Sequence, residues 1–306
     1  MNVSALTPSE LGDRLKQKGI FLQTGAFITH LQTSISSIAE NVGLLYADYP
    51  LLEQADFADF HVSLSPPRNL RRWFKPQVLF SSDGNSPFKP LPLDQAFPML
   101  EWGLNWCVSS HANSYLIIHA AVIEKGGYAA ILPAPPGLGK STLCAALVNR
   151  GWRLLSDELA LVRVSDGKII PLPRPVSLKN QSIEIIQQYE PGAIFSRKVS
   201  DTIKGTVAHM KPPTDSIARA TETAQAAWVI FPKYQASADA RLEAIPKSRA
   251  FMRIADNAFN YSLLEVKGFE TMAGLIDASQ CYEFTYSVLD DAIEAFANLK
   301  PPGSAS

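Results

Sequence analysis

The segment from Tyr128 to Thr142 constrains the fold more than any other part of the sequence. It reads YAAILPAPPGLGKST, an apolar run, a Gly- and Pro-rich loop and the beginning of a second apolar segment. This order predicts a strand, a tight loop and a helix that begins near Lys140. The free amide groups of a first helical turn, together with the helix dipole, attract anions. We therefore interpret the segment as a phosphate-binding loop.

Each position of this loop has an expected role in binding a polyphosphate. Glycine at positions 137 and 139 lets the backbone approach the phosphates without a Cβ in the way. Lys140 can reach the β- and γ-phosphate oxygens, and the hydroxyl of Ser141 can ligate Mg²⁺. The residues expected to bind the nucleotide are Gly137, Leu138, Gly139, Lys140, Ser141 and Thr142.

The loop departs from the standard phosphate-binding motif at its first half. The motif has a glycine six residues before the lysine, where this chain has Ala134. Pro135 and Pro136 carry no N–H, so the amides that bind phosphate must come from residue 137 onward. The alternative interpretation is an ordinary Gly/Pro turn that leads into a helix.

Composition limits the classes of protein to which the chain can belong. The net charge of the 306 residues is −1, which gives no support for a nucleic-acid or anionic-membrane partner. Three widely spaced cysteines in apolar surroundings suit buried thiols in a reducing compartment. No signal-peptide pattern and no apolar run close to 18 residues is present, so a cytoplasmic location is expected.

Residues 1–112 are predicted to form a small N-terminal α/β module that ends in a packing helix. The expected elements are helices at 9–18, 35–46 and 94–111 and strands at 25–30 and 57–64. A basic and aromatic cluster occupies 68–75. It is interpreted as a solvated turn on which Trp73 and Phe74 pack, with a contact to a partner as the alternative.

Residues 113–306 are predicted to form a second domain around a mixed sheet. The apolar run 115–123 and the strand before the phosphate loop are joined by Glu124–Gly127, which predicts an antiparallel hairpin. A doubly wound nucleotide-binding sheet is mostly parallel, so this hairpin favours an α+β fold. The other expected elements are a helix from 140 ending at Gly151, a hairpin at 152–170, strands at 225–231 and 281–286, and helices at 247–257, 268–278 and 290–299. The Pro- and Gly-rich stretch 171–214 is expected to be a long irregular loop with a function.

Two acids and one histidine are candidates for chemistry. Asp157 and Glu158 follow Lys140 by 17 and 18 residues and stand at the mouth of a predicted strand. Phosphoryl transfer needs a carboxylate for Mg²⁺ and a group that orients or deprotonates the acceptor hydroxyl, and two adjacent acids can divide these tasks. The alternative is a turn with solvated acids. His119 lies in an apolar strand, where a histidine is commonly a core residue.

Together these residues resemble a known family. His119, Lys140, Asp157 and Glu158 stand at the relative positions found in the catalytic domain of bacterial HPr kinase/phosphorylase, which has a phosphoenolpyruvate-carboxykinase-like fold. From about residue 40 to 290 the chain also resembles the group called HPr-related kinase A. The segments that carry this resemblance are MLEWGLNWC (99–107), LPAPPG (132–137), LLSDE (154–158), PRPVSLKN (173–180) and KGTVAH (204–209).

The resemblance implies a P-loop kinase domain and a role for each residue. Asp157 would be the base that takes the proton of the acceptor hydroxyl, and Lys140 would contact the transferred phosphate. Glu158 and Ser141 would hold Mg²⁺, and His119 would lie near the phosphates or the base. HPr kinases have two aspartates where this chain has Asp157 and Glu158, so the two roles can be inverted. The downstream Gly- and Arg-rich signature of HPr kinases is absent from the sequence, so HPr itself is not supported as the acceptor.

The stretch 171–214 also supplies basic side chains that can neutralise a γ-phosphate or bind the acceptor. Each taken alone is read as a surface charge. The candidates for this clamp are Arg174, Lys179, Lys204 and His209, with Lys211 nearby.

The predicted function is an ATP- and Mg²⁺-dependent kinase that phosphorylates a Ser or Thr hydroxyl of a small protein or peptide. Two alternatives stay open: a kinase for a small molecule, and a nucleotide-binding adaptor without catalysis. A deep closed pocket at 171–214 would favour a metabolite, and an open groove a polypeptide. HPr kinases form hexamers, so the resemblance also raises a homo-oligomer as an expectation. No nucleic-acid or membrane partner is expected.

Overall fold

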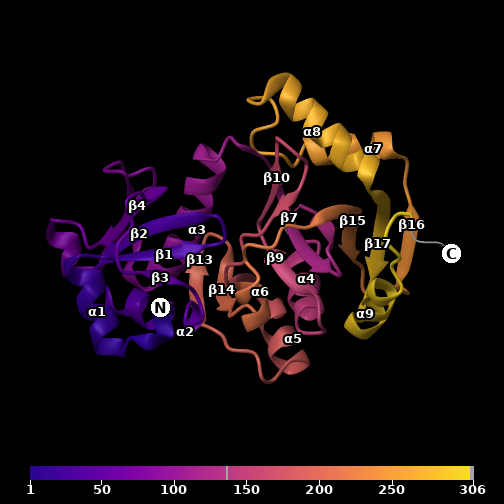
Figure 1. The fold of residues 1–306 in the computed structure, drawn as a ribbon. Helices are drawn as coiled ribbons and strands as arrows, with labels where there is room; N and C mark the ends of the chain where they lie inside the picture. Colours follow the sequence, from indigo (N-terminus) through magenta and orange to yellow (C-terminus); the bar gives the residue numbers. More distant parts are fainter. Residues whose placement is uncertain (136, 304–306) are drawn as a thin grey trace.

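The computed structural model describes residues 1–135 and 137–303 of the chain. They form three sheets with helices packed on them, and the overall architecture is a mixed α/β fold (Figure 1). Pro136 of the predicted phosphate loop lies outside the described residues. Among the described residues, no helix is long and apolar enough to cross a lipid bilayer.

The N-terminal sheet has six strands in the order β3-β1-β2-β4-β5-β6. Their bounds are β1 Ile20–Thr24, β2 Phe27–Thr33, β3 Leu51–Leu52, β4 Phe60–Ser65, β5 Gln77–Ser82 and β6 Leu91–Pro92. Helices α1 (Pro8–Gln17), α2 (Ser36–Leu45) and α3 (Ala96–His111) accompany it. α1 begins with a capping box in which Thr7 and Glu10 satisfy each other's backbone amides.

The central sheet has the order β11-β10-β7-β8-β15-β17-β16, with β9 paired to β7. Its strands are β7 Tyr115–Lys125, β8 Tyr128–Pro133, β9 Arg153–Ser156, β10 Leu159–Arg163, β11 Ile169–Ile170, β15 Gln225–Tyr234, β16 Arg241–Ala244 and β17 Gln280–Tyr286. β8 is antiparallel to β7 and parallel to β15, and β15 is parallel to β17. The prediction of a mixed sheet that starts from a hairpin is therefore confirmed.

Six helices accompany the rest of the described chain. They are α4 Lys140–Val148, α5 Gln181–Tyr189, α6 Thr214–Ala218, α7 Lys247–Ala255, α8 Glu265–Ala278 and α9 Leu289–Ala297. α8 begins three residues earlier than expected. α4 and α9 lie towards one side of the central sheet, whereas α7 and α8 lie towards the other (Figure 1).

The expectation of an irregular loop at 171–214 is wrong. This stretch contains α5 and a three-stranded antiparallel sheet of β12 (Val176–Lys179), β14 (Gly205–Met210) and β13 (Val199–Thr202). The strands are only four to six residues long, and β12 pairs with residues about thirty positions away, from Val176 with Met210 to Lys179 with Val207. Pairing of this kind leaves no local signal in the sequence. The small sheet lies between the N-terminal sheet and α4 (Figure 1).

The expectation that Trp73 and Phe74 pack on a turn is also wrong. Their exposed fractions are 74% and 69%, and Leu70 beside them is 79% exposed. The segment connects β4 to β5, two adjacent antiparallel strands, and contains the short 3₁₀ helix Leu70–Arg72. The rings point outward because the sheet below already has its own core.

The hydrophobic core has three clusters, and one of them joins the two halves of the chain. It combines the N-terminal sheet and helices with Ile117, Leu159, Leu161 and other residues of the central sheet and its connections. The predicted domain boundary at residue 112 therefore separates two parts that share one continuous apolar core. That these two parts are separate domains stays a prediction.

Candidate active site

The phosphate-binding loop prediction coincides with a strand, a turn and a helix start. β8 ends at Pro133, and α4 begins at Lys140 with Gly139 as its N-cap residue. Gly139 has φ 87° and Gly137 has φ 92°, a region that side chains disfavour. A Cβ on Gly139 would lie 2.6 Å from the Tyr286 hydroxyl, so glycine is needed there for space as well as for conformation.

Two strand ends hold this turn in place. The backbone N–H of Tyr234 donates to the carbonyl of Leu138 at 3.1 Å, and the Tyr286 hydroxyl donates to the carbonyl of Gly139 at 3.1 Å. Tyr286 itself is buried. The loop is thus tied to the carboxyl ends of β15 and β17, and the first turn of α4 keeps a fixed direction.

Three of the predicted site residues meet next to this turn. His119 Nε2 lies 2.9 Å from Glu158 Oε2 and 3.2 Å from Lys140 Nζ. Lys140 Nζ is also 3.8 Å from Glu158 Oε2. The register of β7 with β10 pairs His119 with Leu159, which brings the histidine beside Glu158. The side chains of His119, Lys140 and Glu158 are therefore in mutual contact.

The two adjacent acids have opposite electrostatic character. Burial alone would raise the pKa of Glu158, but Lys140, the hydrogen bond with His119 and the nearby Lys179 outweigh it and hold that pKa below its ordinary value. Burial, with a smaller contribution from Glu158, raises the pKa of Asp157 to about 6. Lys140, the Ser177 amide and the Ser141 hydroxyl oppose that rise. At neutral pH Glu158 is ionised beside Lys140, whereas Asp157 can exchange a proton.

Asp157 is almost fully buried, and its two carboxylate oxygens differ in their hydrogen bonding. Its Oδ2 accepts the backbone N–H of Ser177 at 3.0 Å, and its exposed fraction is 4%. Its Oδ1 is buried and has no hydrogen-bond partner among the described residues. Such an atom in a native site indicates a place for a ligand or a water.

A small cavity, which we call the Asp157 cavity, has this carboxylate in its wall. Trp102 and Asn105 of α3, Arg174 and Ser177 near β12, and His209 of β14 contribute to its wall. Sequence reasoning missed the three α3 residues of this wall, Glu101, Trp102 and Asn105, because this helix was interpreted as packing only. Polar Glu101 and Asn105, four residues apart on an apolar helix, were the signal that could have found them.

The four candidates for a phosphate or acceptor clamp fall into two groups. Arg174 and His209 are buried, with exposed fractions of 7% and 1%. Arg174 donates to Asn105 and lies 3.8 Å from Glu101. Burial and the charge of Arg174 lower the pKa of His209 to about 3, so His209 is neutral and is not the cation that the sequence suggested.

Lys179 and Lys204 are the second group. The Lys204 ammonium lies 5.1 Å from the centre of the Trp102 ring, in cation–π contact. Burial and the charge of Lys179 lower the pKa of Lys204. Lys179 also acts electrostatically on Glu158, so both lysines belong to the surroundings of the acids.

The residues present can hold Mg²⁺ only together with a phosphate ligand. No group of three or more His, Cys, Asp or Glu side chains among the described residues is arranged to bind a metal. Mg²⁺ in phosphotransfer sites is commonly held by one or two carboxylates together with phosphate oxygens. The carboxylate of Asp157, beside the Ser141 hydroxyl, and the carboxylate of Glu158 fit that mode.

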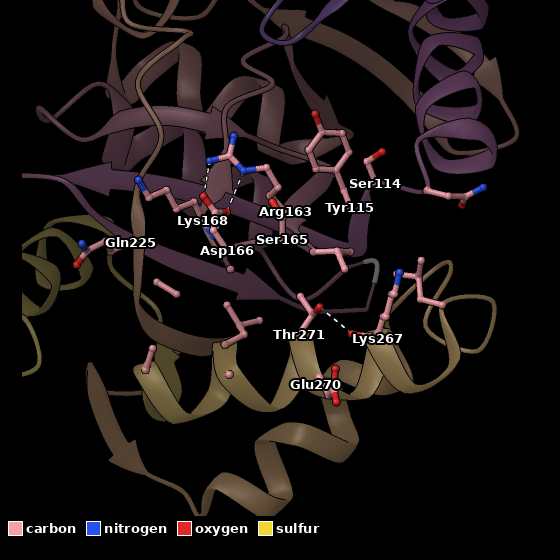
Figure 2. Close-up of a pocket in the computed structure, with 18 of the residues that line it drawn as sticks. Ser114, Tyr115, Arg163, Ser165, Asp166, Lys168, Gln225, Lys267, Glu270 and Thr271 are labelled. Carbon is pink, nitrogen blue, oxygen red and sulfur yellow. Dashed lines mark hydrogen bonds and ion pairs between the residues drawn. The ribbon is translucent and has the colours of Figure 1, made fainter.

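A larger groove lies elsewhere, beside helix α8. It lies between the turn after β10 and helix α8, and its lining residues include Arg163, Asp166, Lys168, Lys267 and Glu270 (Figure 2). Tyr128 and Gln225, the first residues of β8 and β15, also line it. None of the predicted site residues lines this groove. Two charged residues of its wall, Arg163 and Asp166, already form an ion pair with each other.

Comparison with known proteins gives a distant structural relationship. No protein-family model matches the chain, and no curated protein matches it. Among solved structures, the chain is similar to the Hpr(Ser) kinase/phosphatase from Coxiella burnetii. The sequence identity is 12%, the TM-score is 0.26, and the match covers 59% of this chain and 95% of that chain. The function is therefore argued from the site itself.

Proposed function

We propose that this protein is an ATP- and Mg²⁺-dependent kinase that transfers the γ-phosphoryl group to a Ser or Thr hydroxyl of a small protein or peptide. We place it in the cytoplasm, with the kinase domain at 113–306 following the N-terminal module, and we keep a homo-oligomer as part of the proposal. The observation that carries the proposal is the contact among Lys140, His119 and Glu158 beside the start of α4. Asp157, adjacent to Glu158 in the sequence, is a buried carboxylate with a raised pKa.

In this proposal the amides from Gly137 to Thr142 bind the polyphosphate, helped by the dipole of α4. When the nucleotide binds, Lys140 leaves its contact with Glu158 and contacts the transferred phosphate. Asp157 accepts the proton of the acceptor hydroxyl, for which a pKa near the working pH suits it. Bound Mg²⁺ would neutralise phosphate charge and is assigned to Ser141 and Glu158. Because the Ser141 hydroxyl lies close to Asp157, an exchange of roles between Asp157 and Glu158 stays open.

Two substitutions test the assignment. Lys140→Ala and Asp157→Asn should each abolish transfer from radiolabelled ATP to protein or peptide acceptors, while circular dichroism shows the fold intact. Arg241→Ala is a matched control, because Arg241 is an exposed residue that pairs with the exposed Glu243 at 2.9 Å. If the Asp157→Asn protein phosphorylates its acceptor at the parent rate, Asp157 is not the base.

A small-molecule acceptor is the second candidate, and one observation favours it. The segment 171–214 lines a small cavity beside Asp157 with Arg174, Ser177 and His209, which suits a small ligand better than a polypeptide. ADP release should then rise with a hydroxyl-bearing metabolite and not with peptides. ADP release that no acceptor changes, together with nucleotide binding, would favour the non-catalytic adaptor.

A further inference from the structure

Two histidines stand side by side on the N-terminal sheet, outside the candidate active site. β2 and β4 are parallel neighbours, and their register pairs His30 with His61. Both histidines alternate with buried residues along their strands, so their side chains lie on the same outer face of the sheet. His30 is partly exposed and His61 is exposed. The two rings meet edge to face, with their centres 5.4 Å apart.

The distance between the two rings suits a shared metal ion better than a hydrogen bond. Nδ1 of His30 lies 3.4 Å from Nδ1 of His61. Hydrogen bonds from N–H donors usually span about 2.7–3.2 Å, so a direct bond between these nitrogens would be long. Two nitrogens that bind one tetrahedral Zn²⁺ at about 2.0–2.1 Å each are about 3.3–3.4 Å apart. The separation of the two Nδ1 atoms therefore matches one edge of a metal-centred tetrahedron.

The other ring nitrogen of His30 fixes which atom can bind a metal. His30 Nε2 lies 2.8 Å from the backbone carbonyl of Lys18. A carbonyl oxygen only accepts hydrogen bonds, so Nε2 carries the proton and the lone pair of the neutral ring is on Nδ1. Metal-binding histidines commonly have this arrangement, in which the second ring N–H donates to a carbonyl or a carboxylate. Nδ1 of His30 therefore faces His61 as a ligand atom.

The His30 ring is also held in this orientation by packing. The Phe21 ring packs against it, with ring centres 4.7 Å apart. Gly19 lies against the opposite nitrogen, and a Cβ at this position would come within 2.5 Å of His30 Nε2. A ligand that is already oriented loses little conformational freedom when it binds. The pair is thus prepared for a metal before the metal arrives.

The type of ligand atom selects the metal. Neutral imidazole suits Zn²⁺, Cu²⁺ and Ni²⁺, whereas Mg²⁺ prefers oxygen ligands. The Asp83 carboxylate accepts the backbone N–H of His61 at 3.3 Å, and its negative charge favours a cation nearby.

We infer that His30 and His61 together bind one divalent transition-metal ion, such as Zn²⁺, through their Nδ1 atoms. Water completes the coordination on the exposed side. The ion links β2 to β4, and the site is independent of the proposed kinase activity and of its Mg²⁺.

Zn²⁺ binding by the whole chain, without an affinity tag, tests the inference. Isothermal titration calorimetry with ZnCl₂ at pH 7.5 should show a site that His30→Ala and His61→Ala each weaken by about tenfold or more. His111→Ala is the matched control, because His111 is an exposed histidine on α3 whose Nδ1 lies 2.9 Å from the Cys107 carbonyl. It should keep the parent affinity. Parent affinity in the His30→Ala and His61→Ala proteins would overturn the inference.

A second control separates this site from the candidate active site. Zn²⁺ can also bind beside His119 and Glu158, whose side chains are 2.9 Å apart. His119→Ala should leave the binding that depends on His30 and His61 unchanged. A Zn²⁺ signal that disappears in His119→Ala and persists in His61→Ala would contradict the assignment.

A variant that keeps both ligands covers the case in which a histidine variant does not fold. Gly19→Ala places a methyl group against Nε2 of His30 and should turn the ring away from His61. Zn²⁺ affinity should then fall although both histidines remain, with circular dichroism as the check on folding.

A structural measurement tests the site without any variant. In a crystal of the parent protein soaked in ZnCl₂, the anomalous signal of zinc should lie roughly 2.0–2.1 Å from both Nδ1 atoms. Zinc found only at other positions, or no zinc at all, would refute the proposed site.

Discussion

At the scale of single residues, Asp157 combines a catalytic assignment with a cost to stability. The folded protein raises its pKa from 3.8 to about 6, because the carboxyl is buried and stands next to Glu158. The folded state therefore binds this proton more tightly than the unfolded state does. The resulting stabilisation is complete below about pH 4 and is lost as the pH rises through 6. Near pH 7 the buried charge makes folding less favourable.

We predict that Asp157→Asn stabilises the protein at pH 7.5 while it abolishes transfer. The amide removes the buried charge, and its oxygen can still accept the Ser177 N–H. A pKa difference of this size corresponds to at most about 3 kcal/mol in the free energy of unfolding at neutral pH. Urea unfolding at pH 7.5 and pH 4 measures it. The gain should shrink at pH 4, and an equal gain at both values would exclude the ionised carboxylate as its cause.

Some candidate residues named from the sequence lie together in the structure, and the surroundings of others were misjudged, for a physical reason. His119, Lys140 and Glu158, named from their positions alone, contact one another. Arg174 and His209 were expected as cations on a loop, and both are buried. Whether a side chain near a site is a solvated charge or a buried polar group depends on what packs over it, and here that is α3, some seventy residues earlier in the chain.

At the scale of elements, the turn before α4 depends on Gly139 for two separable reasons. Its φ of 87° disfavours a side chain, and a Cβ would also meet Tyr286 Oη at 2.6 Å and Tyr234 Cβ at 3.1 Å. Gly137 has a similar φ of 92°, but no atom lies within 4 Å of the place for its Cβ.

We predict that Gly139→Ala destabilises the protein more than Gly137→Ala. Both substitutions place alanine in the left-handed region, which costs roughly 1–2 kcal/mol. Only Gly139→Ala also displaces the ends of β15 and β17, so its MgATP affinity should fall as well. Chemical denaturation and calorimetry of the two variants measure the difference. Equal losses would show that the Tyr286 contact does not constrain the loop.

Element prediction succeeded where the pattern is local and failed where pairing is distant. The hairpin of β7 and β8 and the helix after the loop follow from adjacent apolar runs and glycines. The sheet of β12, β13 and β14 was missed, because the prolines at 171, 173 and 175 suggested an irregular chain and the pairing partner lies beyond α5. That missed sheet supplies Ser177 and His209 to the wall of the Asp157 cavity.

At the scale of the whole molecule, the N-terminal part reaches the wall of the site. The Tyr46 hydroxyl donates to Glu101 at 2.6 Å, and Glu101 lies 3.8 Å from Arg174 in that wall. The Tyr49 hydroxyl donates to the carbonyl of Pro173 at 2.9 Å. The residues that line the cavity are thus held from both halves of the chain.

We predict that the fragment 113–306 does not fold stably alone. Removal of residues 1–112 would expose Ile117, Leu159, Leu161 and their neighbours in the shared core. It would also leave Arg174 buried without Glu101 and Asn105. Circular dichroism, thermal unfolding and MgATP binding of the fragment test this. Cooperative unfolding with retained nucleotide binding would instead establish an independent kinase domain.

The path from Tyr46 through Glu101 to Arg174 has a consequence for genetics. A random screen for loss of phosphorylation should return substitutions at Tyr46, Glu101 and Asn105, although these residues lie far upstream of the nucleotide motif. Such alleles would look like defects in a separate regulatory region. They would be better explained as lesions of the proposed active site, reached from the other end of the gene.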